Sequence, residues 1–371
     1  MSWDVIVVGA GGVGSAVLSA LARRGVSALG IDRFNPPHDR GSTHGDTRVI
    51  RMAYFEHPHY VPLLRAAYAG WARLEAATGQ PLYVERGVVQ AGPEDGVVVP
   101  GVLASAAQHG LEVEKLSGDE ARARFPSLCV PDGMSAVYER RAGFLWVERC
   151  VEAALGEARA AGAQVLTDAE VTAIERDGSG WCVKTSRGDQ RAARVIIAPG
   201  AWASGLLSEL GVRFEVRRKS LFWLDAADDS VAPVFLFETP DGVFYGFPPM
   251  GGQGLKVAEH SGGHVLRDPL VVDRSVDARE QDRVQAFARD YLRGVRPELR
   301  RHATCLYTMT PDEHFIVDQH PERPGIVVIA GLSGHGFKFA AVLGEIAADL
   351  ALEGRTSHPI GFLSVHRPSL R

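Results

Sequence analysis

The chain has 371 residues, of which 46% are hydrophobic and 23% charged, a composition typical of soluble globular proteins and a length sufficient for two domains. The formal net charge of −5 argues against a nucleic-acid partner. No apolar run approaches the roughly 18 residues needed to cross a membrane, and the first predicted strand leaves no room for a signal peptide.

The N-terminal residues predict a β-strand, a helix and a second strand in succession. Residues 4–8 are a continuous apolar run, which is typical of a buried parallel strand. The helix is expected over residues 13–24, with Gly25 ending it, and the second strand over residues 26–32. This order is that of a βαβ dinucleotide-binding unit.

A glycine motif joins the first strand to the helix. Gly9, Gly11 and Gly14 have GxGxxG spacing, and Asp32 follows 18 residues after Gly14. In such units the glycines allow a tight turn, close approach to a pyrophosphate and close helix–strand packing, and the acid binds a ribose hydroxyl. The motif therefore predicts a dinucleotide site, but by itself it does not separate FAD from NAD.

Helical and strand-rich blocks alternate along the rest of the chain. Residues 33–60 read as a long ordered loop, and a helix is expected over residues 61–78. Helix–strand pieces recur near residues 147–200, residues 214–262 are strand-rich, and a helix is expected near residues 278–293. The chain closes with the strand IVVIAG, the loop LSGHG and the helix FKFAAVLGEIAADLALEG.

We interpret this alternation as an α/β fold in which a second, sheet-rich domain interrupts a dinucleotide-binding domain. The dinucleotide-binding domain is predicted to comprise residues 1–84, 145–213 and 312–371. The second domain is predicted to comprise residues 85–144 and 214–311.

The four cysteines, Cys129, Cys150, Cys182 and Cys305, are scattered and lack C-x-x-C spacing. This pattern favours reduced thiols in the cytoplasm over a disulfide framework or a zinc site. Cys305 lies in HATCLYTMTPDEHFIVD, where it could be a core residue, a redox centre or the anchor of a flavin. Taken alone, a free cysteine is most often a small buried hydrophobe.

A metal site is not expected. His57 and His59 lie close to Glu56, but their i, i+2 spacing in a proline-containing loop is not that of a metal-binding motif, and no other cluster of ligand residues stands nearby in the sequence.

Five strings are specific enough to compare with known families. They are GSTHGDTRVIR (41–51), GFP (246–248), GLK (254–256), CLYTMTPDEHF (305–315) and GLSGHGFKF (331–339). Together they resemble the monomeric sarcosine oxidase family, which includes N-methyl-L-tryptophan oxidase and relatives that act on other secondary amino acids. The resemblance extends from DVIVVGAG at the start to HRPSL at the end.

The resemblance implies a glutathione-reductase-type FAD-binding domain and a smaller, mainly antiparallel-sheet catalytic domain. It implies that FAD is bound covalently, through its 8α-methyl group, to Cys305. The implied reaction is oxidative demethylation of an N-methyl amino acid, giving the primary amino acid, formaldehyde and hydrogen peroxide. The implied partners are a small secondary amino acid and dioxygen, and the implied state is a monomer.

By the motif and the resemblance together, a set of residues is expected to contact the cofactor. They are Gly9, Gly11, Gly14, Asp32, Arg33, Ser42, Thr43, His44, Thr47, Arg48, Ala198, Gly200, Cys305, Gly334, Gly336, Phe337 and Lys338.

The resemblance also assigns catalytic and substrate-binding roles. Lys256 is expected near the flavin ring, where its charge promotes the reaction with dioxygen, and Arg48 is also expected near the ring. Arg51 and Lys338 are expected to hold the substrate carboxylate, Arg51 as a bidentate fork and Lys338 as a point charge. Tyr245 and His260 are expected to flank the substrate amine.

Each of these residues has a plainer alternative, and for Arg48 it is that of a loop arginine with only a structural role. Lys256 and His260 would then be surface residues, Tyr245 a packed strand residue, and Arg51 one partner of a structural ion pair. Lys338 would face solvent in the first turn of the C-terminal helix, although a cation there is disfavoured by the helix dipole.

The substrate and the protein class leave alternatives open. Sarcosine is the first expectation, and N-methyl-L-tryptophan or another N-alkyl or cyclic amino acid is the second. An NAD(P)-dependent dehydrogenase would explain the glycine motif and Asp32, but not the strings around Cys305 and 331–339. A flavoprotein without catalytic activity is a third possibility.

Overall fold

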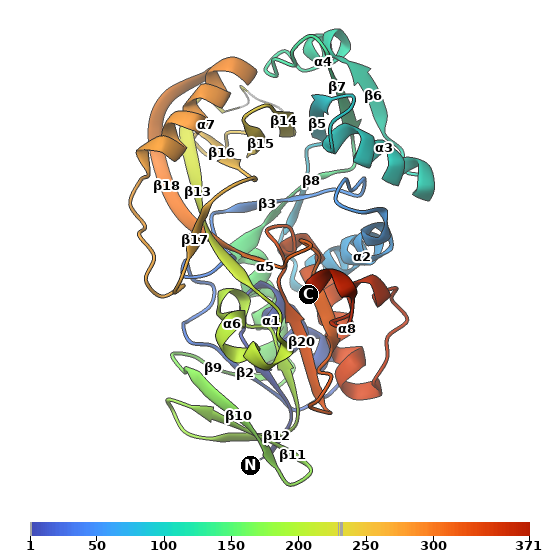
Figure 1. The fold of residues 1–371 in the computed structure, drawn as a ribbon, viewed down its shortest axis with the longest axis vertical. Coiled ribbons are helices and arrows are strands. Elements are labelled where there is room, and N and C mark those ends of the chain that lie inside the picture. The colour runs from blue at the N-terminus through green and yellow to red at the C-terminus, as the bar shows by residue number, and fades with distance from the viewer. Residues whose placement is uncertain (1, 229, 231–232) are drawn as a thin grey trace.

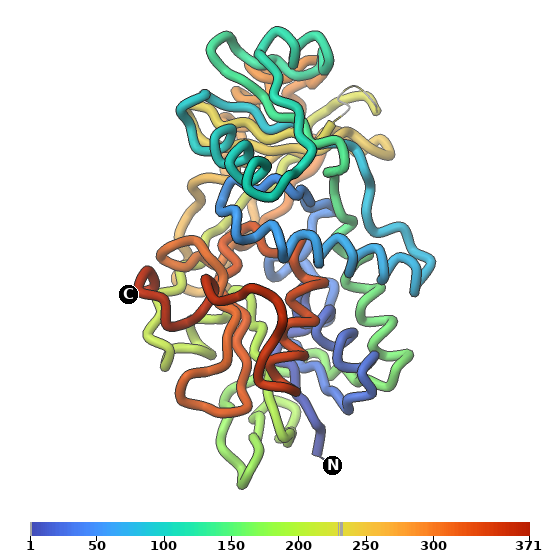
Figure 2. Tube along the Cα trace, turned by 90° about the vertical axis from the view of Figure 1, so that its right-hand side faces the viewer, coloured from blue at the N-terminus to red at the C-terminus, as the bar shows by residue number. Residues whose placement is uncertain are grey.

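A computed structural model of the protein describes residues 2–228, 230 and 233–371. Within these residues the strands form two large sheets and one small one, and the large sheets lie toward opposite ends of the molecule (Figure 1). Figure 2, turned by 90°, shows that most of residues 85–144 and 214–311 gather at the end opposite the N-terminus. We propose that the two large sheets are the cores of the two predicted domains.

The first large sheet, counted over the described residues, has eight strands. Their order is β10-β11-β12-β1-β2-β9, and β20 pairs with both β12 and β19. The central strand β1 pairs in parallel with β2 and β12, as the N-terminal βαβ prediction requires. The strands are β1 (Ser2–Val8), β2 (Ala28–Ile31), β9 (Gln164–Leu166), β10 (Val171–Asp177), β11 (Gly180–Thr185), β12 (Gln190–Ile197), β19 (Ile316–Gln319) and β20 (Ile326–Ala330).

Both faces of this sheet are covered, so β1 is apolar throughout its buried half. Val5 and Val7 pack against a layer of helices, whereas Ile6 and Val8 belong to a cluster on the other face. Helices α1 and α8 contact each other closely at Gly344. The absence of a side chain there permits the contact, since a Cβ on Gly344 would lie 2.6 Å from backbone atoms of Ala16. The helices of this layer are α1 (Gly12–Arg23), α2 (Val61–Thr78), α5 (Val147–Ala160) and α8 (Ala340–Glu353).

The second large sheet has nine strands within the described residues, in the order β17-β13-β16-β15-β14-β5-β7-β6, with β18 also paired to β13. Its pairings are antiparallel except that of β5 with β14. Helix α7 covers part of it through Phe287, whose ring stacks on Phe244 at 4.6 Å. The strands are β5 (Val88–Pro93), β6 (Glu114–Ser117), β7 (Met134–Glu139), β13 (Glu215–Ala226), β14 (Val234–Thr239), β15 (Gly242–Phe247), β16 (Leu255–Glu259), β17 (His264–Leu266) and β18 (Val295–Met309), and the helices are α3 (Val98–His109), α4 (Gly118–Arg124) and α7 (Ala278–Tyr291).

The prediction of a loop over residues 33–60 is wrong in part. A strand, β3 (Thr47–Ile50), pairs with β8 (Gly143–Trp146), which also pairs with β4 (Tyr83–Glu85). The four residues of β3 are too few to stand out among the glycines, histidines and arginines around them. Their strand conformation depends on β8, whose sequence lies almost a hundred residues away.

Most other predicted elements are confirmed, with shifted ends. The helix over residues 61–78 has the predicted bounds, whereas the second strand is shorter than predicted. The C-terminal helix does not begin at Phe337: a 3₁₀ turn, η4 (Phe337–Phe339), precedes α8. The short elements are η1 (Pro58–Tyr60), η2 (Gly200–Trp202), α6 (Ala203–Leu206), η3 (Ser208–Leu210), η5 (Gly361–Leu363) and η6 (Pro368–Leu370).

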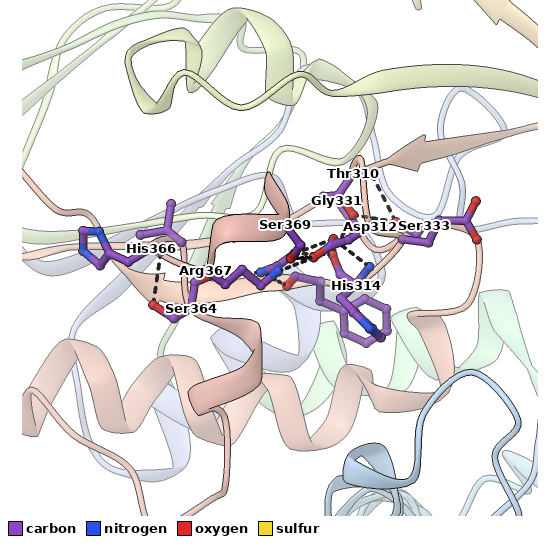
Figure 3. Close-up of polar contacts among 12 residues, drawn as sticks. Thr310, Asp312, His314, Gly331, Ser333, Ser364, His366, Arg367 and Ser369 are labelled. Carbon is purple, nitrogen blue, oxygen red and sulfur yellow. Dashed lines mark hydrogen bonds and ion pairs between the residues drawn. The ribbon is translucent and has the colours of Figure 1, made fainter. Parts of the chain in front are cut away.

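The C-terminal segment is fastened to the turn that follows β18 (Figure 3). Arg367 donates to both carboxylate oxygens of Asp312, Nε to Oδ2 at 2.6 Å and Nη2 to Oδ1 at 2.9 Å. Arg367 also donates to the carbonyls of His314 and Phe315, and Ser369 donates to Asp312. Burial would raise the pKa of Asp312, but the bonds from Arg367 and Ser369 outweigh it and hold that pKa well below its usual value.

The same turn is tied to the loop before η4. The backbone N–H of Thr310 donates to Ser333 Oγ at 3.2 Å, and Ser333 Oγ donates to the carbonyl of Gly331 at 3.0 Å. The C-terminal segment, the turn after β18 and the 331–336 loop therefore form one connected polar cluster (Figure 3).

We expect Arg367→Leu to lower the free energy of unfolding by about 2 kcal/mol, because it leaves the half-buried Asp312 carboxylate without its cation. Denaturant unfolding at pH 7 measures this loss. Because the pKa of Asp312 is lowered in the folded state, the stabilisation is present at neutral pH and disappears on acidification, so the deficit should shrink below about pH 4.

The control is Arg355→Leu, which removes an exposed arginine from the same end of the chain and should change stability by less than about 0.5 kcal/mol. Equal stabilities of the Arg367→Leu and Arg355→Leu variants would contradict the role given to the Arg367–Asp312 pair.

Candidate active site

A long cavity of about 730 Å³ is lined by residues of both large sheets. The carboxyl ends of β1 and β2 border it, which is where open α/β sheets bind ligands. Most of the residues predicted to contact the cofactor line this cavity. They are Gly9, Gly11, Gly14, Asp32, Arg33, Ser42, Thr43, Arg48, Ala198, Gly200, Gly334, Gly336, Phe337 and Lys338.

The three motif glycines meet different surroundings. A Cβ on Gly14 would lie 1.8 Å from the carbonyl oxygen of Gly9, and Gly9 itself has a φ of +89° that side chains disfavour. A Cβ on Gly11 would meet no atom within 4 Å. Gly14 therefore permits helix–strand packing, Gly9 permits the turn, and Gly11 leaves the backbone open to a ligand, as a pyrophosphate site requires.

The end of this cavity at the helix N-terminus fits a dinucleotide. Gly11 is the N-cap of α1, so the unpaired N–H groups of the first turn border the cavity. Asp32 accepts the N–H of Ala10 at 2.8 Å and that of Phe34 at 2.9 Å. A carboxylate has about four acceptor positions, so Asp32 keeps capacity for a ribose hydroxyl.

Cys305 lies just behind the cavity wall. Its side chain is buried, its Sγ is 3.3 Å from Arg48 Nη2 and 3.4 Å from the carbonyl oxygen of Ser42, and both neighbours line the cavity. Arg48 also donates to the carbonyls of Thr47 and Ser42, at 2.8 Å each. The thiol therefore stands beside a guanidinium that is fixed by two backbone carbonyls.

Lys256 is buried rather than on the surface, so its plainer alternative is wrong. Its Nζ donates to the carbonyl oxygens of Gly45 and Thr47 and to Thr47 Oγ1. Burial, reinforced by the charge of Arg48, lowers the pKa of Lys256 well below its ordinary value. His44 is also buried, and its Nε2 has no partner among the described residues.

Lys256 and Thr47 do not line the long cavity; they border a second one of about 380 Å³. Trp146, Trp223 and Met250 contribute its apolar walls. Among the described residues none lines both cavities, and Lys256 is linked to the long cavity through the carbonyl of Thr47, which accepts from both Lys256 and Arg48.

Arg51 lines the long cavity and forms an ion pair there. Its Nη2 donates to both carboxylate oxygens of Glu56, at 2.9 and 3.0 Å. Its Nη1 is buried without a partner in the part of the chain that the structure describes. The ion pair expected as the plainer alternative is thus present, but one arm of the guanidinium is left for another acceptor.

Lys338 faces the cavity from η4, so the alternative of a solvent-exposed helix residue is wrong. Its Nζ donates to the carbonyl oxygen of His335 at 2.8 Å and to the hydroxyl of Tyr54 at 3.2 Å. Burial, together with the charge of Arg51, lowers the pKa of Lys338 to about 7. An anion bound beside it would favour the charged form.

Tyr245 and His260 lie on the second-sheet side of the cavity. His260 is half-buried rather than on the surface, and its Nδ1 is 3.3 Å from the hydroxyl of Tyr307. Burial lowers the pKa of His260 to about 3, so the ring is neutral at physiological pH. These side chains form an uncharged part of the cavity lining.

Four cavity-region residues were missed in the sequence. Tyr307 and His335 lie inside the strings CLYTMTPDEHF and GLSGHGFKF, so their position next to predicted residues was a usable signal. Tyr54 and Glu56 lie in the 33–60 stretch that was read as a loop, and only the folded chain brings Tyr54 to Lys338.

His57 and His59 do not line the long cavity, and their rings contact Phe362. Across residues 2–228, 230 and 233–371, no group of three His, Cys, Asp or Glu residues could hold a metal ion. Among the helices described, none has the length and apolar character needed to span a membrane.

Comparison with known proteins gives a consistent result along the whole chain. A family model described as DAO, FAD dependent oxidoreductase, matches residues 4–350. The chain is 40% identical to a monomeric sarcosine oxidase of Bacillus sp. (strain B-0618), covering 100% of this chain and 97% of that protein. It is 39% identical to an N-methyl-L-tryptophan oxidase of Salmonella enteritidis PT4, covering 96% of each.

Solved structures agree on the fold. NikD, described as an unusual amino acid oxidase essential for nikkomycin biosynthesis, is 28% identical with a TM-score of 0.88 over 98% of this chain and 97% of that chain. Glycine oxidase from Geobacillus kaustophilus, 22% identical with a TM-score of 0.83 over 99% of both chains, shares the fold. These matches confirm the predicted FAD-binding fold with a catalytic domain, and they favour FAD over NAD(P) as the cofactor. The chain belongs to the FAD-dependent oxidoreductase family.

Proposed function

We propose that this protein is an oxidase that demethylates sarcosine or a related N-methyl amino acid. One secondary amine, one dioxygen and one water would give the primary amino acid, formaldehyde and hydrogen peroxide. The observation that carries the proposal is the pair Arg51 and Lys338, two buried cations that line the same long cavity. A buried site of this charge fits a substrate that carries a carboxylate.

The two cations would bind the carboxylate in different ways. Arg51 Nη1 has no partner among the described residues, and two hydrogen bonds account for only two of the three N–H groups of Lys338. One carboxylate could therefore receive a bond from each. Glu56 acts as the counter-ion of Arg51 until the substrate arrives.

The charge of the site also prepares the substrate amine. Transfer of a hydride from the N-methyl carbon requires an unprotonated amine. Arg48, Arg51 and Lys338 all line the cavity, and their positive charge disfavours the ammonium form of a nearby amine. The neutral His260 and the hydroxyls of Tyr245 and Tyr307 would shape the amine site without adding charge.

The cavity would hold FAD along its length, with the pyrophosphate at the N-terminus of α1 and the flavin toward Arg48. When bound, FAD accepts two electrons from the substrate and passes them to dioxygen. We propose that Cys305 anchors the flavin covalently. The guanidinium of Arg48, 3.3 Å from Sγ, supports this role because a nearby cation stabilises negative charge that develops on the sulfur as the bond to the flavin forms.

We propose that Lys256 promotes the reaction with dioxygen. Its amino group is held by acceptors that carry no net charge, so no hydrogen-bonded carboxylate neutralises its charge when it is protonated. A fixed cation in a dry site stabilises the negative charge that develops on dioxygen as it is reduced.

We further propose that the enzyme works as a monomer in the cytoplasm, with a small secondary amino acid and dioxygen as its partners. N-methyl-L-tryptophan is the second candidate substrate, since relatives named for it and for sarcosine are almost equally similar to this chain.

A substrate panel tests the proposed function. We expect purified protein to be yellow and to form peroxide and formaldehyde in equal amounts from sarcosine or N-methyl-L-tryptophan. Glycine, the primary amine that matches sarcosine, should give neither product. Colourless protein, or a lack of peroxide with every secondary amino acid tried, would overturn the proposal.

Cys305→Ser tests the flavin anchor. After acid precipitation the yellow colour of the unaltered protein should stay in the pellet, whereas that of the variant should move to the supernatant, because the serine forms no thioether. Cys182→Ser, which alters another buried cysteine in a different sheet, should behave like the unaltered protein. A yellow pellet from Cys305→Ser would refute the attachment site.

Lys256→Met tests the dioxygen role. Stopped-flow absorbance should show reoxidation of the reduced flavin by dioxygen slowed on the order of a hundredfold, because the charge is lost, with reduction by substrate changed much less. Lys184→Met, at a half-buried lysine in the other large sheet that pairs with Asp189, should change neither rate. Equal slowing of both half-reactions by Lys256→Met would count against this role.

A further inference from the structure

One tyrosine, Tyr54, supports both cations of the proposed carboxylate site. Its ring centroid lies 4.4 Å from the guanidinium carbon of Arg51, and its hydroxyl oxygen lies 3.2 Å from Lys338 Nζ. Tyr54 is fully buried and does not line the cavity, so it does not reach a ligand itself. We infer that Tyr54 and His335 are positioning residues that present Arg51 and Lys338 to the substrate carboxylate, an inference that rests on the proposed function.

The hydrogen bonds around His335 have only one consistent direction. His335 Nε2 is 3.0 Å from the carbonyl oxygen of Glu313, which can only accept, so Nε2 carries the hydrogen. Burial, together with the charge of Lys338, lowers the pKa of His335 well below its ordinary value, so its Nδ1 carries none. The hydroxyl of Tyr54, 2.6 Å from Nδ1, must therefore be the donor.

This direction leaves the oxygen of Tyr54 as an acceptor for Lys338. The chain then runs from Lys338 through Tyr54 and His335 to the carbonyl of Glu313, with a donor and an acceptor matched at each step. Lys338 is fixed further by its bond to the His335 carbonyl, and the N–H of Trp71 holds the Lys338 carbonyl at 2.8 Å. One N–H of Lys338 remains for an anion in the cavity.

The support for Arg51 is of a different kind. Its guanidinium lies over the ring of Tyr54 at 4.4 Å and over that of Phe55 at 4.7 Å. An aromatic face attracts a cation without neutralising it. Tyr54 thus contacts Arg51 through its ring and Lys338 through its hydroxyl. Neither contact neutralises the cation, so both charges remain to bind the substrate carboxylate.

The test compares a carboxylate with its neutral amide. Methoxyacetate has the shape of sarcosine with an ether oxygen in place of the amine, and methoxyacetamide lacks only the charge. Dissociation constants for both are measured on the flavin-loaded protein by calorimetry. Tyr54→Phe, which keeps the ring and removes the hydroxyl, should reduce the preference for methoxyacetate about tenfold, the size expected for loss of a hydrogen bond to a charged group. Tyr54→Leu should reduce it further, because Arg51 also loses its support.

Tyr60→Phe is the matched control. Tyr60 is equally buried and its ring is 5.3 Å from that of Tyr54, but its hydroxyl bonds to His314 and to the N–H of Phe315, away from both cations. Tyr60→Phe should lower stability about as much as Tyr54→Phe while leaving the preference for methoxyacetate over methoxyacetamide unchanged. The comparison of these two variants tests the positioning role even if Tyr54→Leu does not fold.

Two results would overturn the inference and are distinguishable. A Tyr54→Phe protein that keeps its preference for methoxyacetate within twofold would refute the positioning role alone. An unaltered protein that does not prefer methoxyacetate to methoxyacetamide would refute the carboxylate site of the proposed function, and the positioning role with it.

Discussion

The active-site region depends on how buried positive charge is solvated. Arg48, Arg51, Lys256 and Lys338 are largely removed from water, and an isolated buried cation is costly. Three of them are stabilised mainly by carbonyl and hydroxyl oxygens, and only Arg51 pairs with a carboxylate, that of Glu56. Dipoles lower the cost of burial without cancelling the charge, so the cavity region remains positive and suited to an anionic ligand and to charge that develops during a reaction.

The turn before β3 supplies much of this solvation. The carbonyls of Gly45 and Thr47 accept from Lys256, and that of Thr47 also accepts from Arg48. Glu148 fixes the turn, because its carboxylate accepts hydrogen bonds from the N–H groups of Gly45 and Asp46. The pairing of β3 with β8 completes this hold. A stretch with little regular structure of its own thereby becomes a rigid set of acceptors.

Much of the dinucleotide end could be read from the sequence, because its determinants are local. The turn at Gly9, the open backbone at Gly11 and the packing contact at Gly14 arise within six residues, and the strand and helix on either side have strong periodic signals. The role of Tyr54 could not be read, since its hydroxyl depends on Lys338 and His335, which another segment supplies. The short strand β3 could not be predicted either, since its conformation depends on pairing with the distant strand β8.

The sequence by itself determined the family-typical order of elements, the glycine turn and the set of polar residues available to the site. Only the tertiary structure shows which of them are buried together. It places Lys338 at the cavity rather than in solvent and Cys305 beside Arg48. It also places Tyr54 in contact with both Arg51 and Lys338. The physical reason is that backbone preference is local, whereas desolvation and hydrogen-bond direction depend on every group that packs around a side chain.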